Sequence, residues 1–229
     1  MSDGLSIEDK TIPLPLDMLL VKVIKNKETF IHLKLALERL DRYVAMSKLQ
    51  NERIWEAERQ GLETIDQACT SAEMEKGILW LESRSIEAHF YLICWDAVAK
   101  IIDTICQSGS GLKAPRSVWK RHRKTLESYQ EVRDHLEHWT ERLPWEKKKK
   151  DQWQRSSSQG SNKISGNMGY VLLKRTFTFR DEEGHDKEVD ISPASAELLE
   201  HICKQLNEEM VDELHAIVER RRHGRSRCS

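Results

Sequence analysis

Residues 70–109 read TSAEMEKGILWLESRSIEAHFYLICWDAVAKIIDTICQSG, and this stretch decides the fold. Thr70 and Glu73 form a T-x-x-E capping box at its start, and Gly109 and Gly111 end it. Steps of four and three predict a long helix with one buried stripe, as in helix bundles. The stripe residues are Met74, Ile78, Leu81, Ser85, Ala88, Leu92, Trp95, Ala99, Ile102 and Cys106.

Two helices are expected before this stretch. A first helix begins near Leu16, after the prolines at 13 and 15, and is interrupted around Asn26. Apolar residues then recur in steps of three and four, which predicts a helix over about 28–59. Both helices therefore present an apolar face that must be buried against other elements.

Two more helices and a short β-region are expected after it. A third long helix opens at Pro115 and stops at Pro144. The period then changes to the alternation of strands, and a turn containing Gly predicts a β-hairpin over 169–191. A last helix begins at Pro193 and runs to about Arg222.

These elements predict a mainly α fold, an antiparallel four-helix bundle with a small inserted β-hairpin. Residues 1–14 are expected to be a flexible leader, and residues 15–222 a single helical domain. A polar stretch over 146–167 is expected to form a flexible basic loop, and residues 223–229 a basic disordered tail. No internal repeat is visible.

The composition narrows the class of protein. The chain has 229 residues, of which 38% are hydrophobic and 33% are charged. Only 10 Gly and 5 Pro occur along it, which argues against a β-sandwich or barrel with frequent turns. The net charge of −1 means that no global field attracts nucleic acid, so RNA could be bound only through local basic segments.

Common motifs of enzymes and metal sites are missing. The chain lacks G-x-x-x-x-G-K-[ST], G-x-G-x-x-G, H-E-x-x-H and G-x-S-x-G, so we expect no cofactor. Its five cysteines are widely spread and form no C-x-x-C pair, so we expect neither a disulfide framework nor a metal site. Its apolar runs are shorter than the ~20 residues that span a bilayer, and its N-terminus is acidic. We therefore expect a cytoplasmic protein with no membrane contact.

One stretch of the third long helix carries residues suited to RNA cleavage. The segment EVRDHLEHWTERLP places Arg133, Asp134 and His138 within six positions, with His135 and Glu137 as weaker candidates. Neutral imidazole exchanges protons near neutral pH, and guanidinium offers paired donors to a phosphate. Arg also precedes His by five or six positions elsewhere, so spacing alone does not select this stretch; these pairs are Arg84 with His89, Arg116 with His122, and Arg180 with His185.

Helical geometry separates this segment from the others. At about 100° per residue, Arg133, Asp134, Glu137 and His138 fall outside the arc of the buried stripe, on an outward face. The Arg133 and His138 positions are about 140° apart, so a single phosphate would need a distortion or a second protomer to contact both. A purely structural alternative is a solvated face with charge pairs four residues apart, such as Arg133 with Glu137.

The segment RDHLEHW resembles the signature of HEPN domains, helical bundles that include many metal-independent RNases. Arg133 matches the family's arginine, Asp134 its polar second position and His138 its histidine. The resemblance implies RNA cleavage at a cleft between two protomers of a homodimer, often in toxin–antitoxin or phage-defence settings. It also implies an antitoxin or another regulatory protein as a partner. A subgroup of the family carries a Tyr two residues after its His as a target for modification, and this chain has Thr140 there.

The resemblance implies roles for these residues. His138 is expected to act as general acid and base, Arg133 to stabilise the phosphate, and Asp134 to orient one of them. Four lysines flanked by Trp145 and Trp153 are candidates for contact with RNA; they are Lys147, Lys148, Lys149 and Lys150. The alternative is that these lysines only make a loop soluble. The sequence thus predicts a metal-independent endoribonuclease, and the alternative is a non-catalytic interaction or RNA-binding module.

Overall fold

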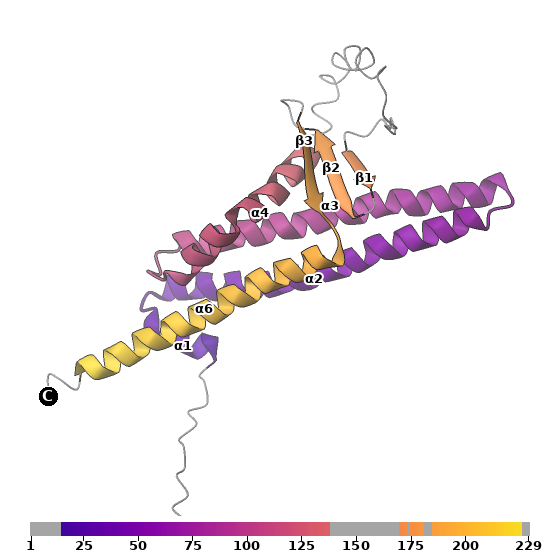
Figure 1. The fold of residues 1–229 in the computed structure, drawn as a ribbon. Helices are drawn as coiled ribbons and strands as arrows, with labels where there is room; N and C mark the ends of the chain where they lie inside the picture. The colour runs from indigo at the N-terminus through magenta and orange to yellow at the C-terminus, as the bar shows by residue number, and fades with distance from the viewer. Residues whose placement is uncertain (1–14, 138–169, 174, 181–184, 226–229) are drawn as a thin grey trace, which may run out of the picture.

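The structure, a computed structural model, describes residues 15–137, 170–173, 175–180 and 185–225 (Figure 1). Within these residues the helices are α1 (Leu16–Val23), α2 (Lys27–Asp66), α3 (Ser71–Gln107), α4 (Ala114–Glu137) and α6 (Pro193–Arg225). Three strands precede α6, namely β1 (Tyr170–Leu173), β2 (Thr176–Arg180) and β3 (Asp186–Asp190). The prediction of a mainly helical chain with one small β-region is confirmed. The expected leader and basic loop lie outside the described residues, and α6 extends to Arg225, into the expected tail.

The helix ends follow the local signals of the sequence. The capping box is formed, since the Thr70 Oγ1 accepts from the Glu73 N–H at 3.3 Å and the Glu73 Oε2 accepts from the Thr70 N–H at 2.9 Å. The Asn26 Oδ1 accepts from two N–H groups of the first turn of α2, which explains the break after α1. Gly109 and Gly111 adopt φ values of 69° and 74°, which end α3.

Residues of all the described helices contribute to one hydrophobic core. Helix α2 packs on α3, α3 on α4, α4 on α6, and α6 on α2, while α1 packs chiefly on α6. The predicted stripe of α3 is buried in this core from Ala88 to Ile102, and Trp95 has no exposed surface. Trp95 stacks on Tyr129 of α4 with ring centroids 3.8 Å apart, which joins α3 to α4.

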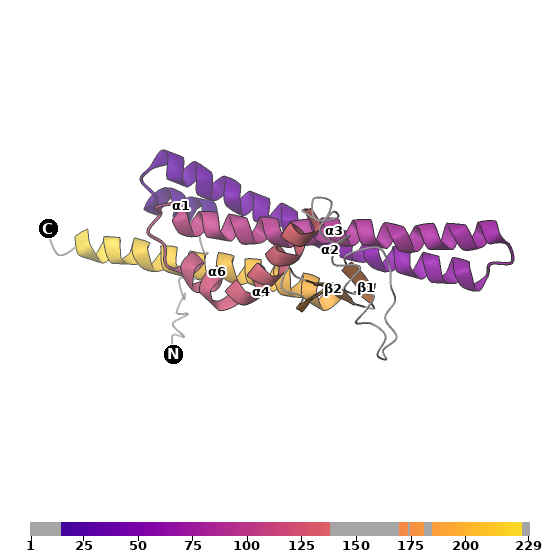
Figure 2. The same cartoon turned by 90° about the horizontal axis from the view of Figure 1, so that it is seen from above.

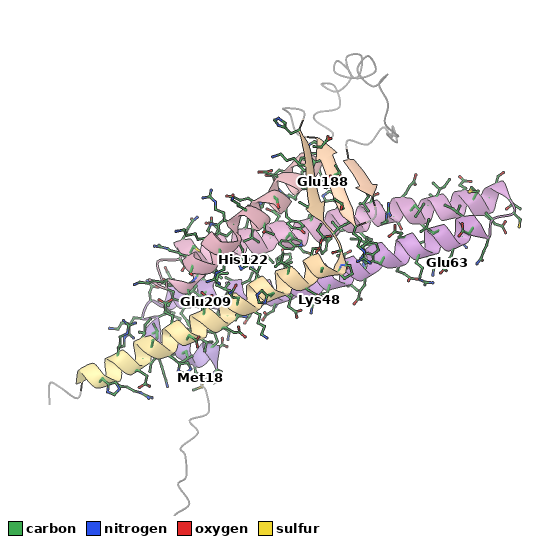
Figure 3. The ribbon with its side chains drawn as sticks, viewed as in Figure 1. Met18, Lys48, Glu63, His122, Glu188 and Glu209 are labelled. Carbon is green, nitrogen blue, oxygen red and sulfur yellow. The ribbon has the colours of Figure 1, made fainter. Side chains whose placement is uncertain are left out.

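The α2–α3 hairpin extends beyond this core as a two-helix projection. Figures 1 and 2 show it reaching past the sheet and the other helices, and Figure 3 labels Glu63 on this part of α2. The predicted stripe is wrong here, because Met74 and Ile78 are 41% and 46% exposed. Apart from α2 and α3, no element that the structure describes covers these two residues. Their helical spacing was therefore not enough to predict burial.

Two glycines allow the helices of the projection to approach each other closely. A Cβ at Gly77 would lie 2.5 Å from the Ile65 Cγ1 and 3.1 Å from the Gly61 carbonyl oxygen. Overpacking in Gly77→Ala is therefore expected to lower the free energy of unfolding by about 1–3 kcal/mol. The higher helix propensity of alanine offsets about 0.5–1 kcal/mol of this loss. Thermal unfolding measures the net loss, with exposed Lys76→Ala as control; equal or higher stability of Gly77→Ala would contradict the close crossing.

The predicted β-hairpin is a three-stranded antiparallel sheet in the order β1-β2-β3. The hairpin prediction is confirmed for β2 and β3, which pair in antiparallel orientation. The third strand was not predicted: residues 170–180 divide into two strands that pair with each other, Leu172 opposite Phe177. Phe177 of β2 pairs with Val189 of β3, and both side chains are buried. The Tyr129 hydroxyl donates to the Asp190 carbonyl, which attaches β3 to α4 beside the core. The sheet thus holds the later part of α4, where the candidate site lies.

Candidate functional site

The described residues contain part of the site that the sequence predicts. Arg133 and Asp134 lie near the end of α4, in the last two turns before Glu137. His138 lies outside the described residues, as do Lys147, Lys148, Lys149 and Lys150. The geometry of the site is therefore built from Arg133 and its neighbours on α3 and α4.

Arg133 is held by three carboxylates. Its Nη2 lies 2.6 Å from the Glu137 Oε1, its Nη1 lies 2.9 Å from the Asp134 Oδ1, and its Nε lies 3.4 Å from the Asp96 Oδ2. Burial lowers the pKa of Arg133, but these hydrogen bonds and charges outweigh burial and raise the pKa above its ordinary value. We call Asp96, Arg133, Asp134 and Glu137 the Arg133 cluster.

The prediction that Arg133 belongs to an outward face is wrong. Its side chain is only 21% exposed, whereas the side chain of Asp134 is 58% exposed. The reason is that α3 packs beside α4, and the nearly buried Asp96 of α3 attracts the guanidinium toward α3. The pair of Arg133 with Glu137, four residues apart, is present as the structural alternative expects.

Asp96 anchors the cluster from α3. Its side chain is 6% exposed, and its Oδ2 also accepts from the Lys100 Nζ at 2.8 Å. The Gln130 Nε2 donates to its other oxygen at 3.4 Å. A buried carboxylate needs such partners, so Asp96 fixes where Arg133 can lie.

His89 of α3 is a member of the site that the sequence interpretation set aside. Its Nε2 is buried and has no hydrogen-bond partner in the described residues. Burial is the main reason that the pKa of His89 lies below its ordinary value, while the Glu137 carboxylate raises it and Arg133 lowers it. His89 is therefore close enough to the cluster for charges to act on its imidazole, which stays neutral at neutral pH. Asp96 follows His89 by two helical turns and lies on the same face of α3. This spacing was the only sign in the sequence that the two residues could belong to one site.

The lowered pKa of His89 makes stability depend on pH. In the unfolded chain His89 binds a proton below about pH 6.5, but in the folded chain it does so only at lower pH. The contribution of His89 to the free energy of unfolding should therefore be constant well above pH 6.5 and should be lost as the pH falls below that value. His89→Gln should flatten this fall relative to wild type, measured by urea unfolding at several pH values. Two parallel pH curves would contradict the shift.

Two other histidines have structural roles. His135, a weaker candidate from the sequence, is 5% exposed and its ring lies 4.5 Å from the ring of Phe179 of β2. The His122 Nε2 is 2.9 Å from the Gln205 Oε1 of α6, so His122 connects α4 to α6. Neither histidine belongs to the Arg133 cluster.

The arrangement combines a fixed cation with a neutral imidazole. Arg133 could bind a phosphate only if the phosphate displaced some of its carboxylate partners. Asp134 and Glu137 are the exposed partners, and ion pairs of this kind are worth about 0–1 kcal/mol each. Asp96 would stay as the buried anchor. In the described part of the chain no group of three or more His, Cys, Asp or Glu side chains is placed to hold a metal ion.

Comparison of the chain with protein-family models, with curated proteins and with solved structures gave no match. Among the described helices, none is both long and apolar enough to cross a membrane.

Proposed function

We propose that this chain is a metal-independent endoribonuclease of the HEPN type, in which α2, α3, α4 and α6 are the four helices of the family's bundle. The proposal is supported by one observation: burial lowers the pKa of the His89 imidazole on α3, and Arg133 of α4 is close enough for its charge to lower it as well, so that a guanidinium and a neutral imidazole occur in one region. In this proposal the enzyme is cytoplasmic and acts as a toxin or defence effector, restrained by an antitoxin or another protein.

The proposed reaction needs a base and an acid. A base removes the proton of the ribose 2′-hydroxyl, the oxygen attacks the adjacent phosphorus, and the bond to the 5′-oxygen breaks as an acid protonates that oxygen. His89, neutral because its pKa is lowered, supplies the base. His138 supplies the acid. Arg133 replaces its exposed carboxylate partners with the phosphate and stabilises the charge that develops there, while Asp96 holds the guanidinium.

Incubation of the purified protein with total RNA tests this function. We expect cleavage that persists in EDTA and leaves 5′-hydroxyl and 2′,3′-cyclic phosphate ends. Intact RNA, or cleavage abolished by EDTA, would contradict the proposal.

A second candidate is a non-catalytic HEPN-like module for protein or RNA binding. It is favoured by the three carboxylates around Arg133, which balance the charge of the guanidinium without a ligand. This module would leave RNA intact. If it binds RNA through basic segments such as Lys147–Lys150, its affinity should fall steeply with salt, as fluorescence anisotropy measures.

A further inference from the structure

The projecting part of the α2–α3 hairpin has almost no core of its own. Between residues 58 and 87, which the structure describes throughout, only Gly61 and Gly77 are buried. The same segment exposes large apolar side chains by 38–59%: Leu62, Met74, Ile78, Leu79, Trp80 and Ile86. Apolar area of this extent on a two-helix projection marks an interaction surface.

Helix α4 covers one line of residues along α3 up to the base of this projection. The Arg116 Nε donates to the Cys106 carbonyl, and the Arg133 Nε lies 3.4 Å from the Asp96 Oδ2. The two helices are therefore antiparallel, and the described part of α4 ends at Glu137, one turn after Arg133. The chain thus leaves α4 in the direction of the hairpin tip.

The same line of α3 continues into the projection, where no other described element covers it. At about 100° per residue, Ile78 has the same direction as Asp96, which faces α4, and Met74 lies about 40° away. Glu75 and Glu82 flank these two apolar residues and are exposed. None of the ion pairs within the described residues involves either glutamate. We call Met74, Glu75, Ile78 and Glu82 the acidic strip.

The charge of the projection is opposite to that of the residues that follow α4. Residues 58–87 contain seven acidic and three basic residues, a net charge of −4. Residues 138–169, which lie outside the described residues, contain three acidic and seven basic residues, a net charge of +4. They also contain large apolar side chains: Trp139, Leu143, Trp145, Trp153, Ile164 and Met168. This segment therefore matches the projection in charge and in apolar character.

Both ends of this segment lie beside the base of the projection. It follows Glu137 of α4 and precedes Tyr170 of β1, and the Leu172 carbonyl of β1 accepts from the Arg84 Nη2 of α3 at 3.0 Å. From Arg84 to the start of α3 at Ser71 the helix is about 20 Å long. A segment of this length can extend about 50 Å outward and return. It is therefore long enough to cover the projection up to its tip.

We propose that residues 138–169 of this chain dock on the acidic strip. Trp139 and Leu143 cover the apolar residues of the strip, and the lysines of 147–150 pair with its two carboxylates. Apolar burial supplies most of the stabilisation, and the opposite charges select this face of α3. The docking extends the cover that α4 gives to α3, and it buries positions that the helical periodicity assigns to the core. It requires no RNA and does not depend on the proposed function.

Limited digestion with trypsin tests the docking on the full chain. Trypsin cleaves after Lys and Arg, and the segment carries seven such residues. Cleavage within 138–169 should be about tenfold faster in Ile78→Asp than in wild type, because proteolysis follows the population of the undocked segment. Trp80→Asp, about 160° around α3 from Ile78, is the matched control and should be cleaved at the wild-type rate. Equal rates in wild type and Ile78→Asp overturn the proposal.

Neutralisation of the two glutamates keeps the test valid if Ile78→Asp disturbs the fold. Glu75→Gln combined with Glu82→Gln changes only exposed positions and creates no new trypsin site. Cleavage within 138–169 should be about two- to fivefold faster than in wild type, as expected for the loss of exposed ion pairs. An unchanged rate at low salt would overturn the pairing of the lysines with the acidic strip.

Disulfide formation identifies the occupant of the strip. In a chain with Cys69→Ser, which removes an exposed thiol near the hairpin tip, Ile78→Cys combined with Leu143→Cys should close a loop within one chain on oxidation. Non-reducing gels should show a monomer of changed mobility. Trp80→Cys in place of Ile78→Cys is the control and should not form this species. A covalent dimer in its place, with a dimer of the wild type in light scattering, would assign the strip to a second copy and overturn the proposal.

Discussion

Replacement of His138 by alanine is expected to lower RNA cleavage by about 10²–10⁴-fold, the contribution typical of general acid–base catalysis. His89→Gln should lower it as well, because His89 supplies the second proton-transfer group in the proposed reaction. The two variants should differ in the pH dependence of the remaining cleavage rate, because one lacks the group that acts as base and the other lacks the group that acts as acid. Initial rates on a defined RNA at pH 5–9 measure both effects.

Two further variants identify what these losses mean. Arg133→Lys keeps the positive charge but loses the paired donors of guanidinium, so cleavage should fall while folding is retained. His201→Ala, at an exposed position of α6, is the matched control and should cleave at the wild-type rate. Wild-type cleavage by His138→Ala would refute the assignment of His138.

Replacement of Trp95 by alanine is expected to lower the free energy of unfolding by about 3–5 kcal/mol. Trp95 has no exposed surface and is the largest fully buried side chain in the described residues. Its ring is nearly parallel to that of Tyr129, at 5°, so the variant leaves a cavity and loses an aromatic contact between α3 and α4.

Trp80→Ala is the matched control for this prediction. Trp80 lies on the projecting part of α3 and is 38% exposed, so its loss should cost less than about 1 kcal/mol in the monomer. Denaturant unfolding of both variants gives the two values. Similar losses would mean that the core does not centre on Trp95.

Local chemistry explains which parts of the fold could be predicted. The capping box at Thr70, the break at Asn26 and the start of α6 at Pro193 depend on residues next to each other in the chain, and each is found. The exposure of Met74 and Ile78 depends on which distant elements reach the hairpin, and periodicity carries no information about that. The same holds for the sheet, whose strands β1 and β2 divide a run that alternation alone joined.

The candidate site follows the same division. The segment around Arg133 is recognisable because its residues are adjacent in the chain. His89 and Asp96 join it only because α3 and α4 pack together, and the packing also turned Arg133 from the predicted outward face toward α3. An isolated helical wheel treats every polar residue as solvated, so it cannot show a nearly buried carboxylate on a neighbouring helix.

The contact between α1 and α6 sets an order of events during synthesis. Leu19 and Leu20 of α1 are fully buried, and α1 packs chiefly on α6. The Arg221 side chain donates to the carbonyls of Lys22 and Val23, so the two ends of the chain are joined. Since α6 is synthesised long after α1, α1 cannot dock on α6 until the ribosome has released α6. Until then the apolar residues of α1 lack this partner, and bringing α1 and α6 together requires closure of a long chain loop, which has an entropic cost.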